Sequence, residues 1–105
     1  MTIETEVLWL DEHRVVSFTE LVEVSGLGEN ELLELVNTGA LPTRDSPGGG
    51  LAFSARVVTM ARTACRLRDD FELDTRGLAV ALRLLERVRD LEGEVARLRA
   101  QLPRA

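Results

Sequence analysis

Residues 17–39 read SFTELVEVSGLGENELLELVNTG, and this stretch decides the fold. Ser17 and Glu20 have the spacing of a capping box, in which each side chain accepts a hydrogen bond from the other residue's backbone amide. We therefore expect a short helix that begins at Ser17 and runs to about Val24. The Ser25-Gly26 pair should end it, because glycine tolerates the left-handed backbone that closes a helix.

A second helix is expected over about residues 29–38, where apolar residues recur at helical spacing. Gly39 should stop it, and Pro42 prevents its continuation. Two short helices separated by a tight glycine turn predict a helix-turn-helix. The residues expected on the inner side of the first helix are Phe18, Leu21 and Val22 or Val24. The second helix is apolar at Leu32, Leu33, Leu35 and Val36.

The next segment predicts a small wing and a third helix. Residues 43–50 are rich in glycine and proline and read as a loop. Leu41 before the loop and residues 51–53 after it predict a two-stranded wing. Ser54 can cap a third helix over about residues 55–70. Its expected buried residues are Val57, Val58, Ala61, Ala64, Cys65 and Leu67, which makes Cys65 a buried, inert thiol.

A chain of 105 residues is enough for a single core, and we expect three parts within it. Residues 1–16 form an N-terminal extension with short strands at 7–10 and 14–16. Residues 17–74 hold the helix-turn-helix, the wing and the third helix. Residues 75–105 form a long helix that begins after the capping residue Asp74.

The long helix carries a heptad pattern, with apolar residues spaced alternately four and three apart. Valine recurs at one position and leucine at the other, as in two-stranded coiled coils. In a parallel pair, Arg87 would meet Glu92 and Glu94 would meet Arg99. The pattern predicts a homodimer, because the last turns extend beyond what a small domain can cover; the alternative is that the seam packs on its own domain. The expected dimer residues are Leu84, Val88, Leu91, Val95, Leu98 and Leu102.

The composition argues against several classes of function. The chain is 45% hydrophobic and 30% charged, which is typical of a folded soluble protein, and no apolar run approaches the ~20 residues that cross a membrane. One histidine (His13) and one cysteine cannot build a catalytic triad or a zinc site. Residues 48–50 lack the lysine of a phosphate-binding loop. We expect no enzyme, metal or cofactor, and a cytoplasmic location because a lone cysteine suits a reducing compartment.

Charge is divided unevenly along the chain. Residues 1–53 hold ten acids and two bases, a net charge of −8, whereas residues 54–105 have a net charge of +3. A helix-turn-helix with a wing and a dimerising helix is the layout of MerR-like regulators, which makes DNA binding a hypothesis. The second helix, however, contains no base and presents Glu29, Glu31 and Glu34, which repel DNA. The arginines of the third helix are expected to lie away from it.

Asp69 and Asp70 close the third helix, where the helix dipole favours cations and disfavours acids. A local rule broken without visible compensation is a sign of a functional surface. Alternatively, Arg62 or Arg66 neutralises the two acids at helical spacing. The sequence leaves both interpretations open.

Residues 66–82, RLRDDFELDTRGLAVAL, resemble the CbpM family of chaperone modulators, in which an Arg-Leu-Arg run leads to a Leu-Asp pair, a glycine and an Ala-Val-Ala-Leu helix. The similarity covers about residues 17–102. It implies a small dimeric adaptor that binds the J-domain of a DnaJ-like co-chaperone and restrains its action with Hsp70. The alternative is a MerR-like DNA-binding transcriptional regulator.

The resemblance also directs the search for partner-binding residues. J-domains present a basic helix to Hsp70, so an acidic surface can compete for it. Two acidic groups are candidates: Glu31 and Glu34 on the second helix, and Asp69, Asp70 and Asp74 around the connection between the third and fourth helices. The second group is favoured, because it lies inside the stretch that most resembles the family.

Overall fold

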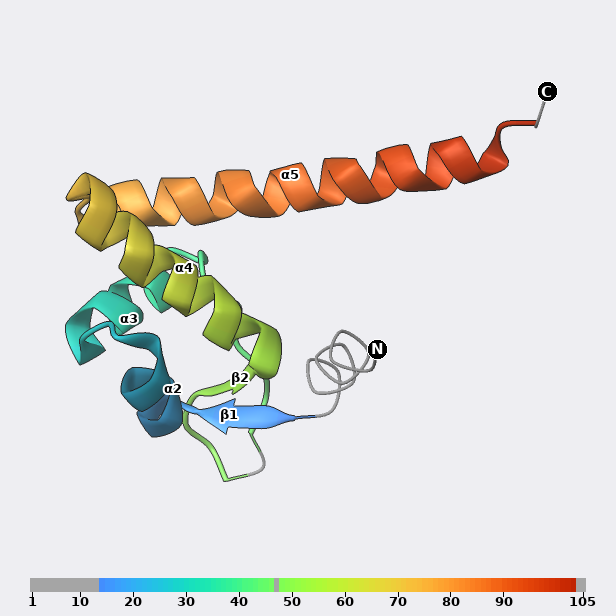
Figure 1. The fold of residues 1–105 in the computed structure, drawn as a ribbon. Helices are drawn as coiled ribbons and strands as arrows, with labels where there is room; N and C mark the ends of the chain where they lie inside the picture. The colour runs from blue at the N-terminus through green and yellow to red at the C-terminus, as the bar shows by residue number, and fades with distance from the viewer. Residues whose placement is uncertain (1–13, 47, 104–105) are drawn as a thin grey trace.

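The computed structural model describes residues 14–46 and 48–103, and within them lie two short strands and four helices (Figure 1). The mainly α, winged helix-turn-helix predicted from the sequence is confirmed. The strand expected at residues 7–10 lies outside the described residues. The elements in chain order are β1 (Val15–Ser17), α2 (Phe18–Ser25), α3 (Glu29–Asn37), β2 (Ala52–Ser54), α4 (Ala55–Phe71) and α5 (Thr75–Gln101).

Helix α2 begins at the predicted capping box. The hydroxyl of Ser17 accepts a hydrogen bond from the amide of Glu20 at 3.1 Å, and Glu20 Oε1 accepts from the amide of Ser17 at 3.3 Å. These hydrogen bonds, and then the charge of Arg14, lower the pKa of the Glu20 carboxyl. Gly26 ends the helix in the left-handed conformation, with φ at 85°. Both ends of α2 therefore follow from local side-chain chemistry.

The wing is present, but its strand partner differs from the one expected. β2 pairs antiparallel with β1, with Val16 opposite Phe53, and the chain before the loop contributes an isolated bridge between Arg44 and Ala52. Leu41 was expected to lead this strand. Instead the backbone amide of Leu41 donates to the carbonyl of Leu35 at 3.2 Å, and its side chain is buried. The chain after α3 thus folds back onto that helix, and β1 takes its place as the strand that pairs with β2.

The core lies between the helix-turn-helix, α4 and the first turns of α5. Leu32 and Leu35 of α3 are buried and Leu33 is exposed. Of the two alternatives for the inner side of α2, Val22 packs against the core and Val24 is exposed. Periodicity alone did not assign Met60 to the core. The largest fully buried side chains are Phe53, Leu21, Leu32, Leu35, Leu41, Leu78 and Val57, and Val58, Cys65 and Leu67 are partly buried against them.

Helices α4 and α5 meet at a sharp connection (Figure 1). Ser54 occupies the capping position of α4, but its side chain makes no capping hydrogen bond. Asp74 caps α5 as predicted, and its Oδ1 accepts from the amide of Gly77 at 2.8 Å. Helix α5 spans 27 residues, and its second half extends away from the rest of the protein. In the described part of the chain, no helix combines the length and apolar character needed to span a membrane.

Candidate partner-binding surface

One acid from each of the two groups predicted from the sequence contacts the same arginine, which brings Glu31 and Asp69 together. Arg68 of α4 donates from Nη1 to Glu31 Oε1 of α3 at 2.6 Å and from Nε to Asp69 Oδ1 at 3.0 Å. Arg68 and Glu31 are each 29% exposed, and Asp69 is 60% exposed. The cluster of Glu31, Arg68 and Asp69, called here the acidic bridge, is therefore open to solvent on one side.

Two contacts fix the acidic bridge to the backbone of the turn between α2 and α3. Glu31 Oε1 also accepts from the amide of Gly28, the residue that precedes α3, at 3.0 Å. Arg68 Nη2 lies 3.5 Å from the carbonyl oxygen of Gly26. The hydrogen bond to Asp69 raises the pKa of Arg68 most, and the charges of Glu31 and Asp69 raise it further. The guanidinium thus holds the turn between α2 and α3 against the end of α4.

This arrangement corrects the expectation that the arginines of α4 lie away from α3. Arg68 reaches Glu31 across 37 residues of sequence, and Arg62 Nε donates to the carbonyl of Val24 at 3.0 Å. The sequence left open whether Arg62 or Arg66 neutralises the acids at the end of α4. In the described residues the partner of Asp69 is Arg68, the adjacent residue.

The remaining predicted residues have different local roles. Asp74 uses one carboxylate oxygen to cap α5. Asp70 is exposed at the end of α4, and within the described residues its side chain makes no hydrogen bond or ion pair. Glu34 is exposed one turn after Glu31, on the same face of α3. The surface therefore carries carboxylates from α3 and from the end of α4.

Phe71 is a surface residue that sequence reasoning missed, because it was assigned to a connector. It is the last residue of α4, next to Asp70, and its side chain is 67% exposed. Glu72 follows it with φ at 53°, and no other non-glycine residue in the described chain has a positive φ. A non-glycine residue in this conformation is uncommon, and here it sets the direction in which the chain leaves α4. An exposed aromatic ring thus stands beside the acids.

The heptad seam of α5 faces away from its own domain. Leu78 and Leu82 are buried in the core, and the helical step from Leu82 to Leu84 is a rotation of about 200°. Each seam residue is correspondingly exposed, from 41% at Leu91 to 68% at Leu102. The described part of the chain does not cover this apolar stripe.

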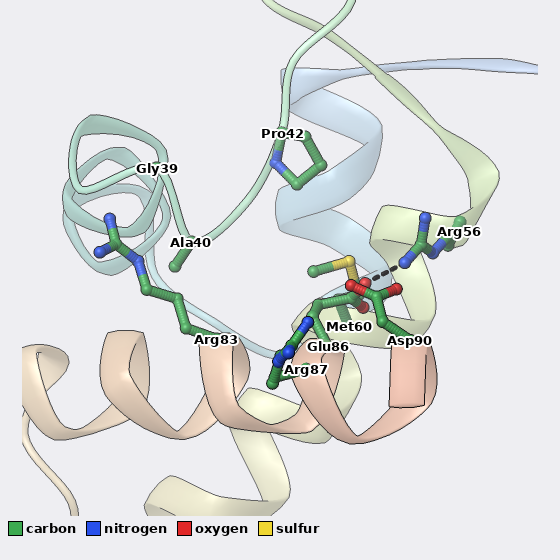
Figure 2. Close-up of a pocket in the computed structure, with 9 residues that line it drawn as sticks. All are labelled: Gly39, Ala40, Pro42, Arg56, Met60, Arg83, Glu86, Arg87 and Asp90. Carbon is green, nitrogen blue, oxygen red and sulfur yellow. Dashed lines mark hydrogen bonds and ion pairs between the residues drawn. The ribbon is translucent and has the colours of Figure 1, made fainter. Parts of the chain in front are cut away.

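A hollow of about 340 Å³ lies where α5 crosses the start of α4 and the loop after α3 (Figure 2). Arg56 of α4 pairs with Glu86 of α5 across it, and Arg83 donates to the carbonyl of Thr38. These contacts fasten α5 to the body of the domain. Among the described residues, the hollow included, no group of three histidine, cysteine, aspartate or glutamate residues is arranged to hold a metal ion.

The fold is that of a helix-turn-helix regulator, and comparison with known proteins gives the same class. Residues 16–100 match the family described as MerR HTH family regulatory protein. Relatives named chaperone modulatory protein CbpM include one from Salmonella arizonae, 34% identical over 88 residues (84% of this chain and 87% of the relative), and one from Escherichia coli, 33% identical with the same coverage. A third, from Salmonella paratyphi B, is 36% identical over 67% of this chain and 69% of its own length.

The chain belongs to the CbpM family of chaperone modulators, within the MerR helix-turn-helix group. Both descriptions name regulators, which are kinds of protein other than enzymes. The resemblance inferred from residues 66–82 is confirmed.

Proposed function

We propose that this protein is a chaperone modulator without enzymatic activity that binds the J-domain of a DnaJ-like co-chaperone and restrains its action with Hsp70. The observation that carries the proposal is the acidic bridge, which joins carboxylates of α3 and α4 on one exposed surface of a CbpM-family chain. A J-domain presents a basic helix to Hsp70, so a protein that covers this helix competes with Hsp70 for it.

Charge complementarity supports this choice of partner. Opposite charges across an interface accelerate association and suppress wrong partners, and close charge pairs can couple by ~1.5–7 kcal/mol. The proposed contact residues are Glu31 and Glu34 of α3 with Asp69, Asp70 and Asp74 at the end of α4 and the start of α5. Phe71 adds the apolar area that charged rims by themselves lack.

We further propose that the chain is a homodimer through the heptad seam. The seam residues point away from the domain core and are 41–68% exposed, which is costly for six large apolar side chains in water. In a parallel pair the flanking charges are complementary, with Arg87 opposite Glu92 and Glu94 opposite Arg99. A second copy therefore satisfies both the apolar stripe and its charged borders.

The J-domain proposal is tested by measuring the affinity of the full chain for J-domains from the same organism. The double variants Asp69→Arg with Asp70→Arg and Glu31→Arg with Glu34→Arg should each weaken binding at least tenfold, or about 1.4 kcal/mol. A matched control, Glu23→Arg with Asp45→Arg, makes the same change in net charge at exposed positions outside the surface. It should weaken binding less than threefold.

Each outcome of this test has a distinct meaning. Circular dichroism confirms that each variant keeps its helices. Loss of affinity in only one double variant assigns the contact to that helix. If the control and the surface variants lose the same affinity, the loss comes from the change in net charge alone, and the proposed site is wrong. If the wild-type chain binds none of the organism's J-domains, the chaperone proposal is wrong.

The second candidate function is DNA binding, which the MerR family match favours. The composition of α3 opposes it, because this helix carries Glu29, Glu31 and Glu34 and no basic residue. Side chains that read base edges are mostly hydrogen-bond donors, and phosphate contacts need cations.

A further inference from the structure

Arg68 is a basic residue in the middle of a surface that is proposed to bind a basic partner, so charge attraction does not explain its presence. A cation in the middle of a surface meant for a basic partner reduces its attraction for that partner. Yet Arg68 makes the closest side-chain contacts on this surface, with Glu31 at 2.6 Å and Asp69 at 3.0 Å. The geometry of those contacts indicates what it contributes.

Each carboxylate of the acidic bridge keeps one oxygen free of nitrogen donors within the described residues. Glu31 Oε1 receives both Arg68 Nη1 and the amide of Gly28, which leaves Oε2. Asp69 Oδ1 receives Arg68 Nε, and Oδ2 has only the weak thiol contact of Cys65 at 3.8 Å. The guanidinium is planar and fork-shaped, so it fixes both carboxylates relative to each other and to the Gly26 carbonyl.

We propose that Arg68 is a positioning residue of the partner surface: it holds the carboxylates of Glu31 and Asp69 in place, so that a cation on the partner's basic helix meets both together. This inference rests on the proposed function. Holding side chains in their bound geometry before binding removes the entropy cost of ordering them at the interface. Held carboxylates should lower the dissociation rate constant of the complex. The repulsion between Arg68 and the basic partner should lower the association rate constant.

The two effects have opposite signs, which gives the proposal a kinetic signature. Arg68→Gln removes one positive charge, so the association rate constant for the J-domain should rise about twofold at low salt. It also releases Glu31 and Asp69, so the dissociation rate constant should rise at least tenfold. A residue that only stabilises the fold would instead lower the fraction of binding-competent protein and leave both rate constants of the remainder unchanged.

Arg66→Gln is the matched control. Arg66 lies two residues away on the same helix, is exposed, and has no ion pair or side-chain hydrogen bond within the described residues. Its removal makes the same change in net charge, so the association rate constant should rise similarly and the dissociation rate constant should change less than twofold. Arg68→Lys keeps the charge but not the fork, so its dissociation rate constant should lie between those of the wild type and Arg68→Gln.

The experiment is stopped-flow or surface-plasmon measurement of the full chain with a J-domain, with titration of the active fraction and thermal unfolding of every variant. Faster dissociation for Arg68→Gln but not for Arg66→Gln, with Arg68→Lys between, supports the inference. If Arg68→Gln matches Arg66→Gln in both rate constants, Arg68 has no positioning role and the proposal is overturned while J-domain binding stands. Absence of binding by the wild type overturns the proposed function itself, and this inference with it.

Discussion

Gly26 connects the turn of the helix-turn-helix to α4 at the scale of single atoms. Its φ of 85° is available to glycine at little cost, and a Cβ at this position would lie 2.8 Å from the Sγ of Cys65. Its carbonyl oxygen faces Arg68. The backbone of the turn therefore approaches α4 so closely that the thiol fills the space a side chain would need. Cys65 is partly buried against the core, whereas its spacing predicted a fully buried thiol.

Gly26→Ala should destabilise the protein for two separable reasons. A left-handed alanine costs about 1–2 kcal/mol, and displacement of the Cys65 thiol adds a further steric cost. Urea denaturation at one fixed protein concentration measures the free energy of unfolding, since self-association would make it depend on concentration. In a Cys65→Ala background the steric part disappears, so the same substitution should cost less there. An equal cost in both backgrounds would show that the thiol does not limit the turn.

Phe71→Ser should weaken J-domain binding without a comparable loss of stability. The side chain is 67% exposed, so the fold loses little buried area when it is removed. Truncation of an aromatic residue at the centre of an interface commonly weakens binding by about 2 kcal/mol or more, which is about thirtyfold in affinity. Val15→Ser, at an exposed strand position opposite the start of α4 and so a helix length away from Phe71, is the control for loss of an exposed apolar side chain. Unchanged affinity for Phe71→Ser would place the ring outside the interface.

At the scale of elements, the sequence predicted what local chemistry determines. The ends of α2 follow from a capping box and a glycine, and α5 begins at Asp74 because that carboxylate caps it. The strand pairing of β1 with β2 and the contact of Arg68 with Glu31 join residues about 37 positions apart. Spacing along the chain carries no information on such contacts, since they depend on how the finished helices pack. The candidate acids were therefore predicted as two groups, and the contact of Glu31 and Asp69 with the same arginine was not predicted.

Helix α5 has two apolar faces: one is buried in the core of its own domain, and the other is exposed. Leu78 and Leu82 anchor its first turns in the core, and Glu86 ties the next turn to Arg56. Beyond that point the apolar stripe has no partner in the described chain, although the helix continues to Gln101. The anchored half fixes the direction in which α5 leaves the domain, and the seam continues along the same unbroken helix.

Leu91→Glu should weaken the dimer, because it places two like charges in the middle of the seam of the paired helices. Light scattering at micromolar concentration should give the mass of a dimer for the wild type and a shift toward the monomer for the variant. Arg97→Glu changes charge on the same helix at a position outside the seam and should leave the mass unchanged. A monomer mass for the wild-type chain would end the coiled-coil interpretation.

At the scale of the whole molecule, the fold of a DNA reader is combined with the wrong charge for DNA. Helices α2 and α3 contain five glutamates and no basic residue. The arginines that contact these helices are engaged: Arg62 by the Val24 carbonyl, Arg68 by the acidic bridge, Arg14 by Glu20 and Arg83 by the Thr38 carbonyl. Their guanidinium groups contact the helix-turn-helix itself, so they are not free to bind phosphate. The charged side chains of α2 and α3 themselves are all carboxylates.

The wild-type chain should not shift duplex DNA in a gel at physiological salt and micromolar protein, because binding to DNA depends on cations that displace the counterions of the phosphates. The double variant Glu31→Arg with Glu34→Arg provides the internal comparison, since it places two cations on the exposed face of α3. If the fold keeps the shape of a DNA reader and lacks only its charge, this variant should gain a weak shift that disappears as salt rises. A salt-sensitive shift by the wild type at sub-micromolar concentration would instead show that arginines elsewhere in the molecule suffice for DNA binding. The MerR-like regulator would then be the better description of this chain's function.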